Sequence, residues 1–97
     1  MRRVVVTGMG VVSSIGDNVE QVKKSLWNGT SGIAADEDMI KYGFRSQVSG
    51  APSLDWEEVL DRKERRFMGA GAAWNFIAMN EAIAMSGLED GDISNIR

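Results

Sequence analysis

The first sixteen residues constrain the fold more than any other part of the chain. Residues 3–16 read RVVVTGMGVVSSIG, an apolar run that only glycines and small polar residues interrupt. An unbroken apolar run rich in β-branched residues favours a strand buried on both faces, because a half-exposed strand would alternate apolar and polar positions. We therefore expect a structural strand over residues 3–12, with helices packed on both of its faces.

A second segment that requires neighbours is the apolar run over residues 69–86, which predicts one long helix ended by Gly87. Its polar residues are Asn75, Asn80, Glu81 and Ser86. A helix that is apolar nearly all round packs inside a larger structure, and a glutamate with two asparagines argues against a membrane span. The strand and the helix together need more partners than 97 residues supply.

Shorter elements are expected between these two segments. The spacing predicts a helix that begins after Asp17 or Asn18 and ends at Gly29. Further expectations are a short helix near Asp36–Lys41, a short strand over Arg45–Gly50, a helix from Ser53 or Asp55 through Leu60, and a polar connector over residues 89–97. Ninety-seven residues allow one small domain at most.

The composition excludes several kinds of site. The chain has no cysteine and no histidine, so disulfides, thiol nucleophiles and histidine bases or ligands are absent from these residues, and we expect neither a cofactor nor a metal. A net charge of -3 and a pI of about 4.8 make nucleic acid or an anionic membrane poor partners. No signal peptide is visible, which makes the cytoplasm the expected location.

Large apolar side chains in the second half are expected to form the core. They are Trp56, Phe67, Met68, Trp74, Phe76, Met79 and Met85. The same residue types could instead line a groove for an apolar ligand, and the sequence does not separate these two interpretations.

Gly8 and Gly10 come after the valines of residues 4–6 and raise the alternative of a dinucleotide-binding loop. That fingerprint places a third glycine three residues after the second, where this chain has Ser13. The glycines are better explained by close packing or by a bend in a buried strand.

One basic cluster stands out in this acidic chain, at residues 61–66 with the sequence DRKERR. In a helix, Arg62, Lys63 and Arg66 would share one side. The simpler interpretation is a solvated face on which Glu58 pairs with Arg62 and Asp61 pairs with Arg65. The alternative is a docking surface for an acidic partner.

The chain resembles the N-terminal portion of the bacterial β-ketoacyl-acyl carrier protein synthases, most closely those of class I. The residues that carry the resemblance are VTGMGVVSSIG at 6–16, GTSGI at 29–33, FRS at 44–46 with Gly50, DRK at 61–63 with RFM at 66–68, and EAIA at 81–84 with Gly87-Leu88. Their order and spacing are specific, and they span almost all 97 residues.

The resemblance implies a thiolase-like fold of two similar α/β halves stacked in layers, of which residues 1–97 would be the first part of the N-terminal domain. It also implies a homodimeric acyltransferase of fatty-acid biosynthesis. Members of the family load an acyl chain on a cysteine and condense it with malonyl-acyl carrier protein after decarboxylation. Their cysteine and two histidines lie beyond this sequence, so the chain alone is expected to be inactive and no catalytic residue is assigned.

One functional element is implied by position. In relatives, the residues matching Arg62, Lys63 and Arg66 contact the acidic helix of acyl carrier protein, and the pattern is most intact at Lys63. The leading hypothesis is therefore a portion of a condensing enzyme that includes part of its carrier-docking surface. The alternative is a non-catalytic module that docks acyl carrier protein, for which the isolated chain would have to fold stably.

Overall fold

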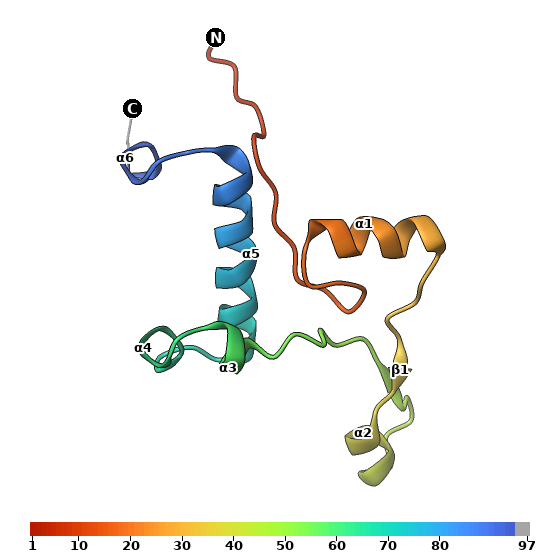
Figure 1. Ribbon diagram of the computed structural model, residues 1–97. Coiled ribbons are helices and arrows are strands. Elements are labelled where there is room, and N and C mark those ends of the chain that lie inside the picture. The colour runs from red at the N-terminus through yellow and green to blue at the C-terminus, as the bar shows by residue number, and fades with distance from the viewer. Residues whose placement is uncertain (95–97) are drawn as a thin grey trace.

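The computed structural model describes residues 1–94 as an open arrangement of short elements around one long helix (Figure 1). The elements are α1 (Val19–Asn28), β1 (Ala34–Ala35), α2 (Glu37–Lys41), β2 (Val48–Ser49), α3 (Trp56–Val59), α4 (Arg62–Arg65), α5 (Ala70–Ser86) and α6 (Asp90–Ile93). The fold is thus mixed, with helices and one two-stranded antiparallel sheet in the described part of the chain.

The two main helices begin and end where the sequence predicts. The side chain of Asn18 caps α1 by accepting the backbone N–H of Gln21 at 3.0 Å. Gly29 ends α1 and Gly87 ends α5, each in the left-handed conformation, with φ of 68° and 71°. Only glycine adopts this conformation without a steric penalty, which explains why both helices stop there.

A small arm projects from the rest of the chain and carries β1, α2 and β2 (Figure 1). Ala34 pairs with Ser49 and Ala35 pairs with Val48 in an antiparallel ladder. Asp36 caps α2 by accepting the backbone N–H groups of Asp38 and Met39. The short helix is confirmed, the strand predicted over 45–50 is reduced to two residues, and β1 was not predicted.

The prediction of a buried strand over residues 3–12 is wrong for the described chain. This segment forms no strand, and it runs alongside α5 without a neighbouring strand (Figure 1). Val4 and Val6 are 92% and 85% exposed. A strand requires a ladder of backbone hydrogen bonds, and the two short strands of the arm pair only with each other.

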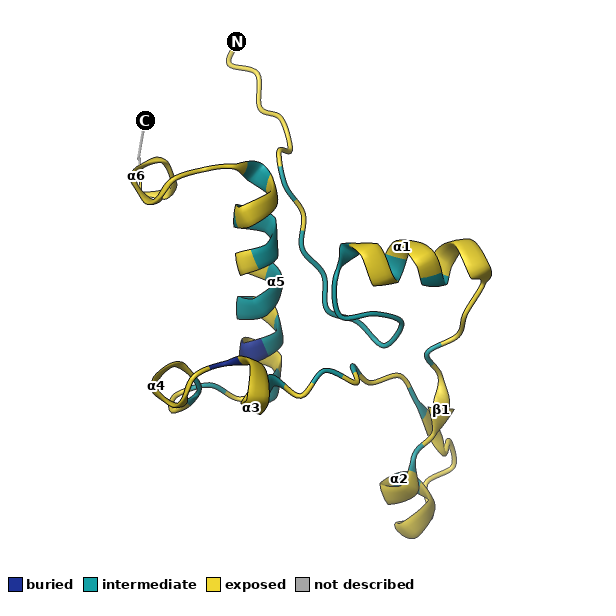
Figure 2. Cartoon of the chain, viewed as in Figure 1, coloured by how far each residue is buried: buried dark blue, intermediate teal, exposed yellow. Residues whose placement is uncertain are grey.

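The core is small and lies where α3 meets the first turns of α5 (Figure 2). Its buried members are Leu60, 6% exposed, and Ala73, 0% exposed. The indole N–H of Trp74 donates to the backbone carbonyl of Leu54 at 3.4 Å and ties the preceding loop to the helix.

Several side chains expected in the core lie at the surface instead. Phe67 is 88% exposed, and Met79 and Met85 are also exposed, whereas Trp56, Met68, Trp74 and Phe76 are half-buried. The physical reason is geometric: α5 is apolar on every side, but α3 and the N-terminal segment cover only part of it.

The final segment also differs from expectation. Residues 90–93, predicted as polar connector, form the short helix α6, whose first turn is held by reciprocal hydrogen bonds between Glu89 and Asp92. The rest of that connector, residues 95–97, lies outside the described residues. Across residues 1–94, no helix combines the length and the apolar character needed to cross a bilayer.

The overall dimensions show how open the chain is. Its radius of gyration is 17.0 Å, against about 12–13 Å for a compact domain of this length. Its accessible surface is 8252 Å², against roughly 5,500 Å² for a compact protein of this mass. Much of the apolar surface that folding normally removes from water therefore stays exposed.

Candidate functional site

The glycines of the N-terminal segment lie directly against α5. A Cβ added at Gly8 would overlap the backbone carbonyl of Ala82, and one added at Gly10 would overlap that of Ala78. Because α5 occupies the space beside both glycines, they do not form an open loop that could cradle a phosphate. The close-packing interpretation is therefore confirmed, and the dinucleotide-binding alternative is wrong.

Glu81 fixes the position of this segment. From the middle of α5, its carboxylate accepts the backbone N–H of Val11 at 3.1 Å. The same carboxylate accepts the N–H of Val19, the first residue of α1, at 3.2 Å. A single acidic side chain thus joins α5, the N-terminal segment and α1, which gives it a structural role.

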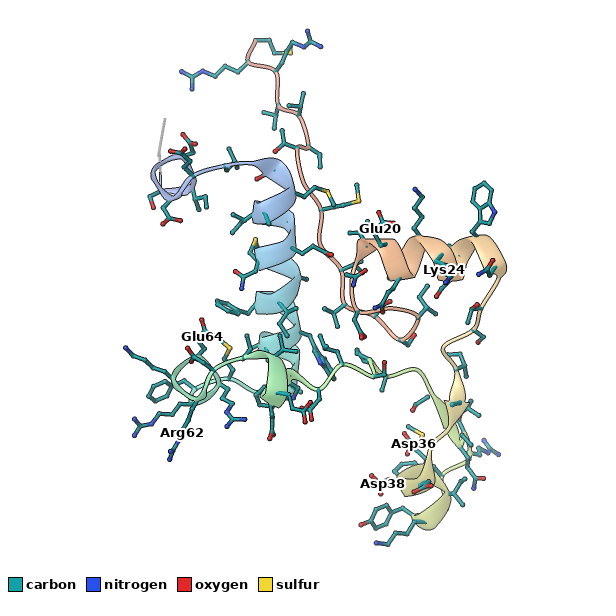
Figure 3. The ribbon with its side chains drawn as sticks, in the orientation of Figure 1. Glu20, Lys24, Asp36, Asp38, Arg62 and Glu64 are labelled. Atoms are coloured by element: carbon teal, nitrogen blue, oxygen red, sulfur yellow. The ribbon has the colours of Figure 1, made fainter. Side chains whose placement is uncertain are left out.

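The basic cluster is built on the short helix α4. Asp61 begins this helix, because its side chain accepts the backbone N–H groups of Lys63 and Glu64 at 2.9 and 2.8 Å. Arg66 continues the helical backbone with φ -55° and ψ -31°. Arg62 and Arg66 are therefore one helical turn apart, and Arg62 and Glu64 leave the turn in different directions (Figure 3).

The four cationic side chains of the cluster differ in their exposure and in their hydrogen bonds. Arg62, Lys63 and Arg66 are exposed, whereas Arg65 is half-buried and donates to the backbone carbonyl of Glu57 at 2.6 Å. Asp61 caps α4 and Arg65 donates to a backbone carbonyl, so contacts to the backbone replace the ion pair expected between them. Arg65 thereby fastens α4 to α3, and the remaining cations face solvent.

A hollow of about 750 Å³ lies on this surface, lined by Arg62, Lys63, Arg65, Arg66 and Phe67. The guanidinium of Arg66 lies 5.6 Å from the centre of the Phe67 ring, within the range of a cation–π contact. The sequence pattern identified three of these residues. It missed Arg65, whose role depends on the fold, and Phe67, which an apolar pattern assigns to the core.

A second hollow, of about 690 Å³, is apolar and lies between the N-terminal segment and α1. It is lined by Met9, Gly10, Val11, Val19, Val22, Lys23, Leu26 and Trp27. Val19, Val22 and Leu26 of α1 line this hollow together, but Leu26 and Trp27 remain exposed.

The chemical capacity of these surfaces is binding. Within residues 1–94, no three Asp, Glu, His or Cys side chains are arranged to hold a metal ion. The guanidinium and ammonium groups of the basic cluster suit carboxylates or phosphates of a partner. Clustered positive charge also speeds the encounter with an acidic partner and orients it.

Comparison with known proteins assigns the chain to a family. The family described as "Beta-ketoacyl synthase, N-terminal domain" matches residues 1–97, the whole chain. Among curated proteins, 3-oxoacyl-(acyl-carrier-protein) synthase 1 of Haemophilus influenzae is 45% identical over 97 residues, which cover all of this chain and 24% of that protein.

Two further relatives support the same assignment. Synthase 1 of Escherichia coli K12 is 44% identical over 88 residues, 91% of this chain and 22% of the relative. Synthase 2 of Vibrio cholerae is 37% identical over 89 residues, 91% of this chain and 21% of the relative. The chain thus spans about a quarter of the length of these relatives, and it belongs to the β-ketoacyl synthase family.

Proposed function

We propose that this chain forms the first part of the N-terminal domain of a β-ketoacyl-acyl carrier protein synthase. Such an enzyme extends fatty acids by decarboxylative condensation of malonyl-acyl carrier protein with an acyl-enzyme thioester. The observation that carries the proposal is the family match over residues 1–97, supported by relatives named for 3-oxoacyl-(acyl-carrier-protein) synthesis. In the same proposal, the enzyme is a cytoplasmic homodimer with thiolase-like layers.

The chemistry of the proposed reaction needs groups that these residues do not contain. A thiolate attacks the acyl thioester, and hydrogen-bond donors stabilise the oxyanion that develops. Without cysteine or histidine, residues 1–97 contribute framework and binding surface to the enzyme rather than reacting atoms. The framework role is supported by the exposed apolar side chains of the N-terminal segment and α5, which need covering elements.

The binding contribution that we propose is carrier docking through Arg62, Lys63 and Arg66. These cations are exposed and lie within one helical turn of each other. Arg65 and Asp61 are held by backbone contacts and keep that turn in place. A free-standing docking module is not favoured, because an isolated chain in which Leu60 and Ala73 are the only buried residues among 1–94 has little core to stabilise it.

A chimera tests the enzymatic assignment. Residues 1–97 would replace the matching segment of the E. coli K12 synthase 1, and condensation of malonyl-acyl carrier protein would be assayed with the purified protein. We expect a folded dimer that retains condensing activity, because a family segment should complete the same framework. A chimera that folds with the parent's melting temperature but condenses nothing would contradict the proposal.

Charge reversal in the chimera tests docking. Arg62→Glu with Lys63→Glu should weaken binding of acyl carrier protein by about tenfold or more, because like charges then face each other across the interface. The matched control is Lys23→Glu with Lys24→Glu on α1, which changes the net charge equally at another place. Equal affinities for the two double variants would rule out docking at this cluster.

A further inference from the structure

We infer that Phe67 is the apolar anchor of the docking surface: its ring receives an apolar side chain that the acidic partner helix presents among its carboxylates. The inference rests on the proposed function and adds an apolar contact to the electrostatic recognition proposed there. Charge alone brings an acidic protein to this surface. The aromatic ring beside the cations would select a partner that also carries an apolar residue at the right place.

The position of the ring carries the inference. Phe67 is 88% exposed and lines the same hollow as the cations of the cluster. The backbone N–H of Met68 donates to the carbonyl of Arg65 at 3.2 Å, so a hydrogen-bonded turn directly after α4 fixes the segment that presents the ring. An aromatic side chain held in water beside positive charges gains free energy when an apolar group covers it.

The neighbouring Arg66 strengthens the case for an anchor. Its guanidinium lies 5.6 Å from the ring centre, so a cation and an aromatic ring are presented side by side on this surface. Interfaces concentrate their affinity in a few aromatic and arginine side chains that are desolvated at the centre and ringed by weaker polar contacts. The hollow offers that arrangement, with one ring and three solvent-facing cations around it.

The distribution of charge over the chain favours a protein as the partner that binds the docking surface. The chain carries a net charge of -3, so a polyanion such as nucleic acid or an anionic bilayer is repelled by the rest of the molecule. A short acidic helix places its carboxylates only over the cluster. Side chains three and four residues apart lie on the same face of a helix, so such a helix can also present an apolar side chain between those carboxylates.

The experiment uses the chimera and measures carrier affinity at low and high salt. Phe67→Ala should weaken binding about tenfold at both salt concentrations, because burial of apolar surface is insensitive to screening. Phe67→Leu should restore most of the affinity. Arg62→Ala should weaken binding at low salt and have little effect at high salt, which makes it the matched electrostatic control.

A fluorinated phenylalanine at position 67 gives a readout that does not depend on removing the ring. Its fluorine resonance should shift when acyl carrier protein is added, and it should not shift with vesicles of anionic lipid or with single-stranded DNA. The inference is overturned if the resonance does not shift when the carrier is added, or if it shifts with the vesicles or the DNA instead.

Failure of the inference is distinguishable from failure of the proposed function. If reversal of Arg62 and Lys63 leaves carrier affinity unchanged, docking at the cluster is wrong altogether. If that reversal weakens binding while Phe67→Ala leaves it intact, docking stands and the anchor is wrong. A lower melting temperature for Phe67→Ala with unchanged affinity likewise shows that the ring packs inside the enzyme, and it overturns the inference.

Discussion

The carboxylate of Glu81 accepts the backbone N–H of Val19 at 3.2 Å, although 62 residues separate them in the sequence. Val19 is the first residue of α1, where the helix leaves backbone donors without partners and carries partial positive charge. The same carboxylate accepts the N–H of Val11. One side chain of α5 therefore caps a second helix and holds the segment that leads into it.

Removing this carboxylate should destabilise the framework. Glu81→Ala in the chimera leaves two backbone donors without their acceptor, and we expect a loss of about 2–3 kcal/mol in the free energy of unfolding. Glu81→Gln keeps one acceptor oxygen and should lose less. Denaturant unfolding measures both, with Glu20→Ala on the exposed first turn of α1 as the control. Equal stabilities for Glu81→Ala and the control would contradict the capping role.

The contact between the N-terminal segment and α5 should not tolerate a methyl group. Gly10→Ala places a Cβ on the backbone carbonyl of Ala78, so the segment must move away and lose packing, at about 2–3 kcal/mol. Gly71→Ala is the matched control, since a Cβ there meets nothing within 4 Å and the helix should gain about 0.5–1 kcal/mol. Thermal unfolding of the two chimeras should therefore shift in opposite directions. A Gly10→Ala variant as stable as the parent would show that the close approach is not needed.

Local signals in the sequence predicted well where α1 begins and where α1 and α5 end. Asn18, Gly29 and Gly87 act on the residues next to them, so a cap or a left-handed glycine can be identified without knowing the fold. Asp61 is also a local cap, since its carboxylate begins α4, but the sequence interpretation had paired it with Arg65 instead.

Non-local contacts were not predictable in the same way. The valines of residues 4–6 form an apolar run that is typical of a buried strand, but strand formation depends on partners elsewhere in space. The role of Phe67 depends likewise on which neighbours cover it, and an apolar residue type favours the core by default. The link from Glu81 to Val19 joins segments that no local pattern connects.

The arm should show a pH response centred on Asp36. The pKa of this carboxyl lies below its ordinary value, first because the Ser49 hydroxyl donates to it at 2.8 Å and then because the N–H groups of Met39 and Asp38 do. A lowered pKa means that the stabilisation is complete above the unfolded value of about 3.9 and is lost as the pH falls through the folded value. Ser49→Ala should raise the pKa of Asp36 towards the ordinary value, as measured by carbon NMR of labelled aspartate.

The control for this titration is Ser53→Ala, which alters a serine outside the contacts of Asp36. It should leave the titration of Asp36 unchanged. A midpoint that stays equally low in Ser49→Ala would show that the backbone donors alone lower the pKa.

The isolated 97-residue chain should not behave as a stable domain. Its accessible surface of 8252 Å² exceeds that of a compact protein by roughly 2,800 Å², and its exposed side chains include Val4, Trp27 and Met79. Apolar surface on this scale favours self-association, and the small core offers little to oppose the conformational entropy of unfolding. We expect the purified chain to bind a hydrophobic dye, to elute as aggregates in size exclusion and to melt without a sharp transition. The chimera, in which the remaining enzyme covers these faces, should melt cooperatively under the same conditions. A cooperative melt of the isolated monomer would contradict this prediction and would return the free-standing docking module to consideration.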